Sequence, residues 1–343
     1  AIICKNTEEW AVSAYATYGL CGQHIPMYET QIAKEWEYII RDCGAKVLLA
    51  ANRTVFDQTR NFTEQIETLE HVVLLTGSAD GDVTTYEDLL KTGRENPVEV
   101  QQPESQTPMG MIYTSGTTGN PKGVILSHSN LIFECSVVIP LLGMTKDVRT
   151  LAFLPWAHVF GQVAEVHGII GCGGSAGLVD DVNTLIEELG VVKPSVFFAV
   201  PRVYNRIYDR LREQMMEKPG FIRALFYGGL KQARREREGE TLGFMDNLIL
   251  TLARKIIFKK ILNRFGGNLR IAVSGASALS PSVAEFVNDI GISIYEGYGL
   301  SENTAALSLN YPGVRRFGSV GKPLPGVRIE IDKTVEGSKE EDG

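Results

Sequence analysis

The stretch Ile112–Gly123, IYTSGTTGNPKG, constrains the fold more than any other part of the sequence. The residues before it, 109–113, are apolar and strand-like, and those after it, 124–126, are apolar again. Glycines let backbone N–H groups approach a ligand closely, hydroxyls donate hydrogen bonds, and Lys122 supplies positive charge, which together suit a phosphate chain. The Walker pattern is excluded, because no Ser or Thr follows Lys122. The alternative is a flexible linker, although a linker would not ordinarily place Pro-Lys-Gly between two apolar runs.

The segment YTSGTTGNPKG resembles the phosphate-loop signature of the AMP-forming adenylate enzymes. This family comprises acyl-CoA synthetases, luciferases and the adenylation domains of peptide synthetases. The resemblance implies that the loop binds ATP and that Lys122 acts in catalysis by offsetting phosphate charge. The residues that it assigns to nucleotide binding are Thr114, Ser115, Gly116, Thr117, Thr118, Gly119 and Lys122.

A second motif, ISIYEGYGLSE at 292–302, joins a strand-like start to a glycine-containing turn. It also resembles the family. The resemblance implies that Tyr298 stacks on adenine, that Ser301 contacts a phosphate, and that Glu302 helps to bind Mg²⁺, which prefers oxygen ligands. The alternative for Glu302 is a carboxylate at the start of a helix. The other nucleotide contacts implied by the family are Glu296, Gly297 and Gly299 in this motif, and Gly275, Ala276 and Ser277 at the end of the predicted strand 269–277.

The segment LAFLPWAHVFG, residues 151–161, resembles the family segment beside the substrate carboxylate. The implied catalytic role of His158 is to orient that carboxylate or to cover the developing anhydride; the alternative is a packed histidine. Amino-acid-activating relatives carry an Asp near this point, but no Asp or Glu occurs between Thr150 and Gln162. Because a buried ammonium without a partner is costly, the sequence favours a carboxylic acid without an α-amine.

Two further segments bear on the substrate and on possible partners. Residues 168–179, GIIGCGGSAGLV, have little side-chain bulk, which suits either a tunnel for a long acyl chain or close strand–helix packing. Trp156 is either a gate to that tunnel or a core residue. Residues 202–264 hold fifteen Lys or Arg against seven Asp or Glu, with apolar residues among them. Such a segment is typical of an amphipathic surface on an anionic membrane or of a solvated helical insert. A long basic insert at this point resembles the long-chain fatty acyl enzymes.

Strand-like and helix-like segments alternate along the chain, which predicts an α/β fold with doubly wound, mostly parallel sheets. We expect a first lobe at residues 1–135 with the phosphate loop, a second lobe at 136–310 with the adenine and acyl sites, and the start of a small β-barrel at 311–343. The chain opens like a buried strand and ends in a polar run. We therefore expect a piece of a longer protein, without the family's C-terminal domain and its catalytic lysine.

Composition narrows the class of partner. The formal net charge of −7 argues against nucleic acid. The five cysteines are scattered without a C-x-x-C pair, which suits a reducing compartment and no structural zinc. No apolar run reaches the length of about 18 residues needed to span a membrane. We expect a cytoplasmic protein, with peripheral membrane contact through 202–264 as an open alternative.

The motifs together imply ATP-dependent activation of a long-chain fatty acid to an acyl-adenylate, followed by transfer of the acyl group to coenzyme A. Three alternatives share the same motifs. They are a ligase for aryl or medium-chain acids, a luciferase-like adenylating enzyme, and a nucleotide-binding module without turnover.

Overall fold

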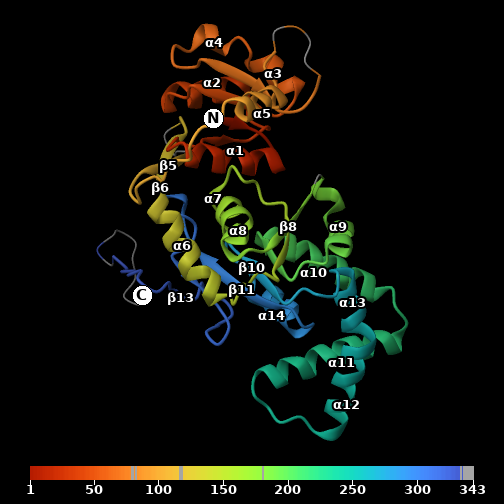
Figure 1. Cartoon of the computed structure of the whole chain (residues 1–343). Coiled ribbons are helices and arrows are strands. Elements are labelled where there is room, and N and C mark those ends of the chain that lie inside the picture. The colour runs from red at the N-terminus through yellow and green to blue at the C-terminus, as the bar shows by residue number, and fades with distance from the viewer. Residues whose placement is uncertain (79–80, 82, 116–118, 180, 333, 335–343) are drawn as a thin grey trace.

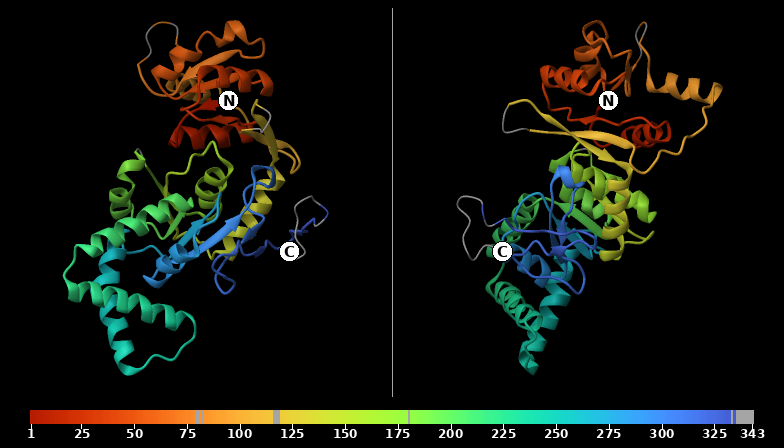
Figure 2. Two further views of the ribbon diagram at one scale, coloured as in Figure 1. Left: turned by 180° about the vertical axis from the view of Figure 1, so that it is seen from behind. Right: turned by 90° about the vertical axis from the view of Figure 1, so that its left-hand side faces the viewer.

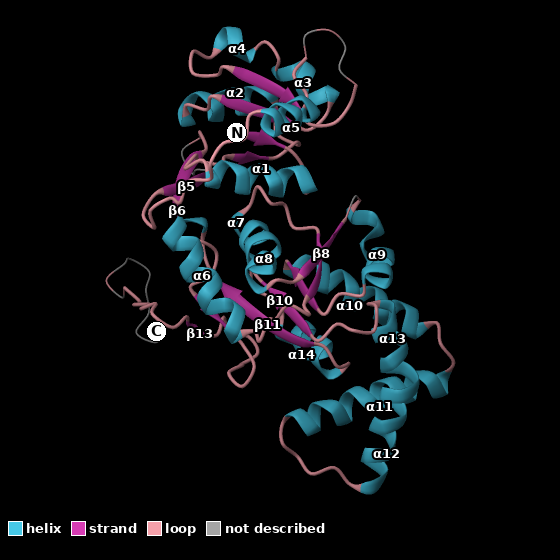
Figure 3. Cartoon of the chain, viewed as in Figure 1, coloured by secondary structure: helices cyan, strands magenta, loops and turns pink. Residues whose placement is uncertain are grey.

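The computed structural model describes residues 1–78, 81, 83–115, 119–179, 181–332 and 334. Two α/β lobes lie one above the other, and a helical projection extends from the far end of the second lobe (Figure 1). Figure 3 shows strands at the centre of each lobe with helices around them. The expected α/β class with mostly parallel sheets is confirmed by the strand pairing in both lobes.

The first lobe is built on a four-stranded parallel sheet in the order β2-β1-β3-β4. Thr7 caps α1 by accepting the N–H of Trp10, and Gly44 ends α2 in a left-handed conformation with a φ of 63°. The strands are β1 (Ile2–Ile3), β2 (Pro26–Met27), β3 (Val47–Ala50) and β4 (His71–Leu74). The helices are α1 (Glu8–Gly19), α2 (Ala33–Cys43), α3 (Arg53–Thr59), α4 (Phe62–Gln65) and α5 (Tyr86–Glu95).

The phosphate loop connects two antiparallel strands, β5 (Pro108–Thr114) and β6 (Lys122–Ser127). This hairpin departs from the parallel pairing that the alternation of strands and helices predicts. β5 pairs with β6 and joins the first lobe through an isolated bridge between His24 and Gly110. A short connection allows antiparallel pairing, whereas parallel strands need a crossover of about a dozen residues or more.

The second lobe contains a five-stranded sheet in the order β13-β12-β11-β10-β9. β9 (Val196–Ala199), β10 (Ile271–Ser274) and β11 (Ser293–Tyr298) are parallel, while β12 (Ser308–Leu309) and β13 (Lys322–Pro323) add to it in antiparallel fashion. A parallel pair, β7 (Arg149–Ala152) and β8 (Ser175–Leu178), lies beside β9. The helices are α6 (His128–Leu141), which spans the expected lobe boundary at residue 135, α7 (Val159–Gly161), η1 (Gln162–His167), α8 (Gly168–Cys172), η2 (Val182–Thr184), α9 (Leu185–Val192), α14 (Pro281–Asp289) and η4 (Ser301–Asn303).

The basic segment 202–264 is helical, as expected. It contains α10 (Pro201–Met216), α11 (Gly220–Arg237), α12 (Phe244–Ala253), η3 (Arg254–Phe258) and α13 (Lys259–Arg264). α11 and α12 extend together away from the second lobe in both views of Figure 2. Gly229 lets them approach closely, because a Cβ there would overlap Ala253. Among the described residues, no helix combines the length and apolar character needed to cross a bilayer.

Residues 311–334 add to the second lobe. The expected start of a separate β-barrel is not formed by the described residues, because β13 pairs with β12 of the second sheet. The alternating residues 327–331 form no strand. A strand requires a neighbour for its backbone hydrogen bonds, and no described residues pair with this segment.

The two lobes meet at a buried aromatic contact. Trp10 of α1 packs edge-on against Trp156, with ring centroids 5.3 Å apart. Asn6 donates to the carbonyl of Leu154 (2.8 Å) and accepts the N–H of Trp156 (3.0 Å). Trp156 is 4% exposed, which supports its interpretation as a core residue rather than a gate.

Candidate functional site

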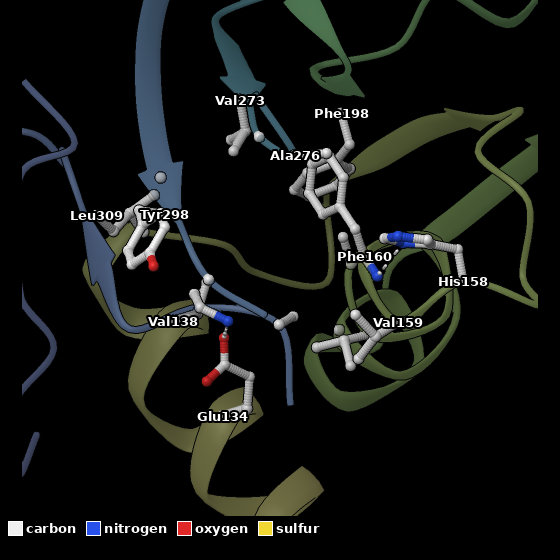
Figure 4. Close-up of a pocket in the computed structure, with 18 of the residues that line it drawn as sticks. Glu134, Val138, His158, Val159, Phe160, Phe198, Val273, Ala276, Tyr298 and Leu309 are labelled. Atoms are coloured by element: carbon white, nitrogen blue, oxygen red, sulfur yellow. Dashed lines mark hydrogen bonds between the residues drawn. The ribbon is translucent and has the colours of Figure 1, made fainter. Parts of the chain in front are cut away.

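A cavity of about 370 Å³ lies at the carboxyl ends of β10 and β11. These neighbouring parallel strands deliver the turns 274–276 and 298–302 to one edge of the sheet, where ligands of open α/β sheets bind. Figure 4 shows side chains of these turns around the same space as His158 and helix α6. The expected site residues that line the cavity are Thr114, Ser115, His158, Gly275, Ala276, Gly297, Tyr298, Gly299, Ser301 and Glu302.

Small residues expose backbone on one wall of this cavity. Ala276 has a φ of 69°, a left-handed conformation that is uncommon for a residue with a Cβ and is typical of functional sites. A Cβ at Gly299 would overlap the carbonyl oxygen of Ala305. Tyr298 stands beside this wall and is 45% exposed. Its ring and the bare backbone together suit a planar base.

Polar groups suited to phosphates reach the cavity from two segments. Thr114 and Ser115 lie at the end of β5, and Ser301 and Glu302 begin η4. In the part of the chain that the structure describes, no three His, Cys, Asp or Glu side chains form a metal-binding group. Glu302 offers a carboxylate beside Ser301, which fits Mg²⁺ because this ion commonly takes its remaining ligands from phosphate and water.

The remaining expected nucleotide-binding residues fall into two groups. Gly116, Thr117 and Thr118 lie outside the described residues. Gly119, Lys122, Ser277 and Glu296 do not line the cavity. Lys122 begins β6 opposite Thr114 and is exposed. Glu296 is buried, and its carboxylate accepts the N–H of Leu279 at 3.1 Å, so it holds the turn that follows β10.

His158 caps the short helix α7 from the cavity wall. Its Nδ1 accepts the N–H of Phe160 at 3.2 Å, so the neutral ring carries its proton on Nε2. Partial desolvation lowers the pKa of the His158 imidazole, which favours this neutral form. Buried Glu165 supports the preceding segment by accepting the N–H groups of Phe153 (3.3 Å) and Leu154 (3.1 Å). A positioned Nε2–H donor is what the expected role toward a substrate carboxylate requires.

An apolar arm extends the cavity between α6 and the η1–α8 segment. Its walls are formed by Val138, Ile139, Leu142, Met144, Val163, Ala164, Gly168, Phe198 and Leu309. Gly171, Gly173, Gly174 and Gly177, which the sequence offered as a tunnel lining, do not line this cavity. A Cβ at Gly171 would lie 3.1 Å from Ile139, and Gly173 ends α8 with a φ of 72°. The alternative of close packing is therefore the one supported for these glycines.

The sequence analysis missed the contribution of α6, including Glu134. This residue lines the cavity, is 2% exposed, and accepts the N–H of Ala306 at 3.0 Å. Burial raises the pKa of the Glu134 carboxyl to about 8. The spacing of residues 134, 138 and 142 would have placed them on one helical face. Nothing in that spacing shows which face meets a ligand.

Comparisons with known proteins show the family of this chain and its fold. The profile of the AMP-binding enzyme family matches residues 1–343. The chain is 30% identical to a long-chain-fatty-acid–CoA ligase from Mycobacterium bovis, over 96% of this chain and 56% of that one. It is 29% identical to a peroxisomal long chain acyl-CoA synthetase from Arabidopsis thaliana, over 95% and 47%. The chain thus spans about half the length of the curated relatives it matches.

Solved structures with the same fold include an anthranilate CoA ligase in complex with anthranoyl-AMP. It gives a TM-score of 0.69 at 22% identity, over 95% of this chain and 54% of that one. A long-chain-fatty-acid–CoA ligase from Archaeoglobus fulgidus gives 0.67 at 18% identity, over 94% and 56%. At these identities the likeness concerns the fold alone.

Proposed function

The chain belongs to the AMP-binding enzyme family, and from this we propose that it provides the nucleotide and acyl sites of an ATP-dependent long-chain fatty acid–CoA ligase. The observation that carries the proposal is one cavity with two unlike parts. A polar edge at the ends of β10 and β11 suits an adenosine phosphate, and an apolar arm beside α6 suits an acyl chain. An acyl-adenylate consists of an acyl chain and an adenosine phosphate joined by one bond, so its two halves match the two parts of the cavity.

The proposed reaction has two steps. A carboxylate oxygen of the fatty acid attacks the α-phosphorus of ATP, and the bond to pyrophosphate breaks. The thiolate of coenzyme A then attacks the acyl carbonyl carbon, and AMP leaves with the electron pair of the C–O bond. A carboxylate is already ionised at pH 7, so the first step needs no general base.

Residues of the cavity would stabilise the charge that develops in the first step. The Nε2–H of His158 would donate to the substrate carboxylate, and the hydroxyls of Ser115 and Ser301 would donate to phosphate oxygens. Glu302 would hold Mg²⁺, which supplies positive charge against the phosphates when bound. Preorganised donors of this kind act without reorganising during the reaction.

The proposed substrate is a long-chain acid without an α-amine. The arm is apolar, and Glu165 is turned toward the backbone of Phe153 and Leu154. Because burial raises the pKa of Glu134 to about 8, most of this carboxyl is uncharged at pH 7 and is a poor partner for an ammonium. An anionic or cationic substituent on the acid would therefore be desolvated without a counterion in the arm.

The test is a calorimetric series with the chain itself. AMP and non-hydrolysable acyl-sulfamoyl adenosines with hexadecanoyl, octanoyl or benzoyl groups are titrated in turn. We expect the hexadecanoyl compound to bind at least about tenfold more tightly than the benzoyl compound, a difference of about 1.4 kcal/mol. Tighter binding of the benzoyl compound would replace the substrate class with aryl acids. Equal binding of all compounds and AMP would favour a nucleotide-binding module.

Peripheral contact with an anionic membrane through residues 202–264 is a second part of the proposal. α12 and η3 carry an exposed apolar stripe, which consists of Phe244, Met245, Leu248, Leu252 and Ile256. Exposed lysines lie at the C-terminal end of this stripe, at Lys255, Lys259 and Lys260. Apolar side chains that enter the headgroup region, flanked by cations that attract anionic lipids, are typical of interfacial helices.

Vesicle flotation tests this contact. We expect the chain to float with vesicles of phosphatidylglycerol and phosphatidylcholine, less so with phosphatidylcholine alone, and less at high salt. The double variant Leu248→Glu with Leu252→Glu is expected to lose flotation, whereas Leu89→Glu on α5, also exposed, is expected to keep it. Equal flotation of both variants, or equal binding to the neutral vesicles, would reject the membrane contact.

A further inference from the structure

Glu134 lines the same cavity as the turns 274–276 and 298–302 and the apolar residues of α6. It projects from the middle of α6, with Val138 one helical turn further along the arm. Figure 4 shows its carboxyl group rising from α6 and hydrogen-bonded to a backbone nitrogen, which belongs to Ala306. The side chain is almost fully buried, so this interaction takes place away from bulk water. A buried carboxyl in a substrate cavity requires a physical explanation.

The hydrogen bond from Ala306 fixes a turn whose backbone is unfavourable by itself. Thr304 and Ala305 both have left-handed conformations, with φ of 62° and 99°. Such conformations persist where the surrounding structure supports them. The same turn presses the carbonyl of Ala305 against Gly299, in the segment that carries Tyr298, Ser301 and the cavity edge. Glu134 is therefore connected to the nucleotide side through the 304–306 turn.

We propose that Glu134 is a positioning residue, which ties α6 to the Ala305–Ala306 turn and so holds the Tyr298–Glu302 segment in its nucleotide-binding position. The inference rests on the proposed function in one respect, namely that a nucleotide occupies this edge of the cavity. Glu134 need not touch the nucleotide for this role. It also links the helix that lines the acyl arm to the segment that receives adenine.

The charge of Glu134 matters because the proposed ligands are anionic. Desolvation raises its pKa to about 8, so the carboxyl is mostly neutral at pH 7 and mostly ionised at pH 9. The ionised form still accepts the N–H of Ala306, but it adds a negative charge to the wall of the cavity that would receive the anionic ligand. Ligand affinity should therefore fall between pH 7 and pH 9.

Other titratable groups near Glu134 must be distinguished from it. Those of the cavity wall are Cys135, His158, Tyr298 and Glu302. Among the described elements that pack on α6, η1 and α8 carry Glu165, His167 and Cys172, and β6 carries Lys122. Desolvation raises the pKa of Cys135 to about 12 and lowers that of His167 to about 3, so neither changes charge between pH 7 and pH 9. Because Glu134→Gln changes Glu134 alone, the difference in pH dependence between this variant and the wild type excludes the contribution of the other titratable groups.

The experiment measures AMP affinity by calorimetry at pH 7 and pH 9 for the wild type, Glu134→Gln, Glu134→Ala and Asp289→Asn. The glutamine keeps an oxygen acceptor for Ala306 without an ionisable proton, and alanine removes the acceptor. Asp289 lies on α14, has a pKa raised to about 6 by burial, faces Arg237, and does not line the cavity. It controls for the effect of replacing a buried carboxyl by an amide.

At pH 7 we expect Glu134→Gln and Asp289→Asn to bind AMP like the wild type and Glu134→Ala to bind about tenfold more weakly, as for one lost buried hydrogen bond. From pH 7 to pH 9 the wild type should lose affinity several-fold more than Glu134→Gln. Wild-type affinity in a folded Glu134→Ala variant overturns the proposal. If Glu134→Ala does not fold, an equal pH dependence of the wild type and Glu134→Gln overturns it. A wild type that binds no AMP overturns the proposed function itself.

Discussion

Gly299 occupies a position in the cavity wall where any side chain would collide with backbone. A Cβ there would overlap the carbonyl oxygen of Ala305, whereas a Cβ at Gly190, within α9, would meet nothing within 4 Å. Backbone cannot yield as the end of a flexible side chain can. The close approach of Gly299 and Ala305 thus brings the turn containing Ser301 and Glu302 to the end of β11.

Gly299→Ala and Gly190→Ala form a matched pair that tests whether a side chain is tolerated at the crowded position 299 as it is at the open position 190. We expect Gly299→Ala to weaken AMP binding by at least tenfold or to prevent folding, because the turn must shift. Gly190→Ala should leave AMP affinity unchanged and raise the free energy of unfolding by up to about 1 kcal/mol, since alanine is favoured over glycine inside a helix. Calorimetry and urea denaturation measure the two quantities. Unchanged affinity in Gly299→Ala would show that the turn is not constrained as described.

Glu134 also predicts a dependence of stability on pH. Its pKa is about 8 in the folded protein and about 4.3 in an unfolded chain, so the folded state retains a proton that the unfolded state releases. The stability that this group contributes is full below pH 4 and declines as the pH rises toward 8. Between pH 6.5 and 8, wild-type stability should fall relative to Glu134→Gln by about 1 to 2 kcal/mol.

Urea denaturation at pH 6.5 and 8 measures this difference. Asp289→Asn serves as the control, because the pKa of Asp289 is raised only to about 6 and most of its titration lies below this window. Parallel stability profiles of the wild type and Glu134→Gln across the window would contradict the burial of an uncharged carboxyl at this site.

At the scale of elements, α6 has two different faces. Val138 lines the cavity, whereas Ile132 is 62% exposed on the same helix. The cavity face therefore lines the apolar arm, and the other face meets solvent. The helix as a whole is apolar, so hydrophobicity by itself does not distinguish these two faces.

Val138→Phe and Ile132→Phe test this assignment with the same kind of change. The added ring at 138 should occupy part of the arm and weaken binding of the hexadecanoyl-sulfamoyl adenosine, relative to AMP, by about tenfold or more, because overpacking is costly. Ile132→Phe should leave this ratio unchanged. If both variants keep the wild-type ratio in calorimetric titrations, the acyl chain does not occupy the arm beside α6.

At the scale of the whole molecule, the site depends on how the two lobes are joined. The loop at 115–121 belongs to a hairpin beside the first lobe, whereas the turn that carries Tyr298 belongs to the second sheet. Trp10 and Trp156 contribute to the buried contact between the lobes. The proposed nucleotide would contact residues of both lobes, so its binding would require this contact to hold.

Trp156→Ala should therefore weaken the coupling of the lobes. We expect a loss of about 3 to 5 kcal/mol in the free energy of unfolding, as is usual for a buried aromatic residue, and separate unfolding transitions for the two lobes. Trp36→Ala removes a similar side chain within the first lobe alone and should lower the stability of that lobe. Circular dichroism and tryptophan fluorescence follow the transitions. One shared transition in Trp156→Ala would contradict this role of the interface.

Features set by local interactions were predictable from the sequence. Thr7 and Gly44 cap helices through contacts within a few residues, and the strand-to-turn motif at 292–302 places Tyr298 and Glu302 at a strand end. The antiparallel pairing of β5 with β6 was not predicted. Neighbouring strands and their register depend on contacts across the fold, and the sequence around the loop is compatible with either kind of pairing.

By itself, the sequence determined the family resemblance, which implies a phosphate loop at 112–123 and nucleotide contacts at 275–277 and 296–302, because such motifs are continuous runs of residues that can be read without knowing the fold. The tertiary structure alone decided that α6 lines the apolar part of the cavity, that the glycines of 168–179 pack against neighbouring elements, and that Glu134 is buried beside the turn at 304–306. The physical reason is that burial and desolvation depend on which segments, far apart in the chain, come to lie side by side.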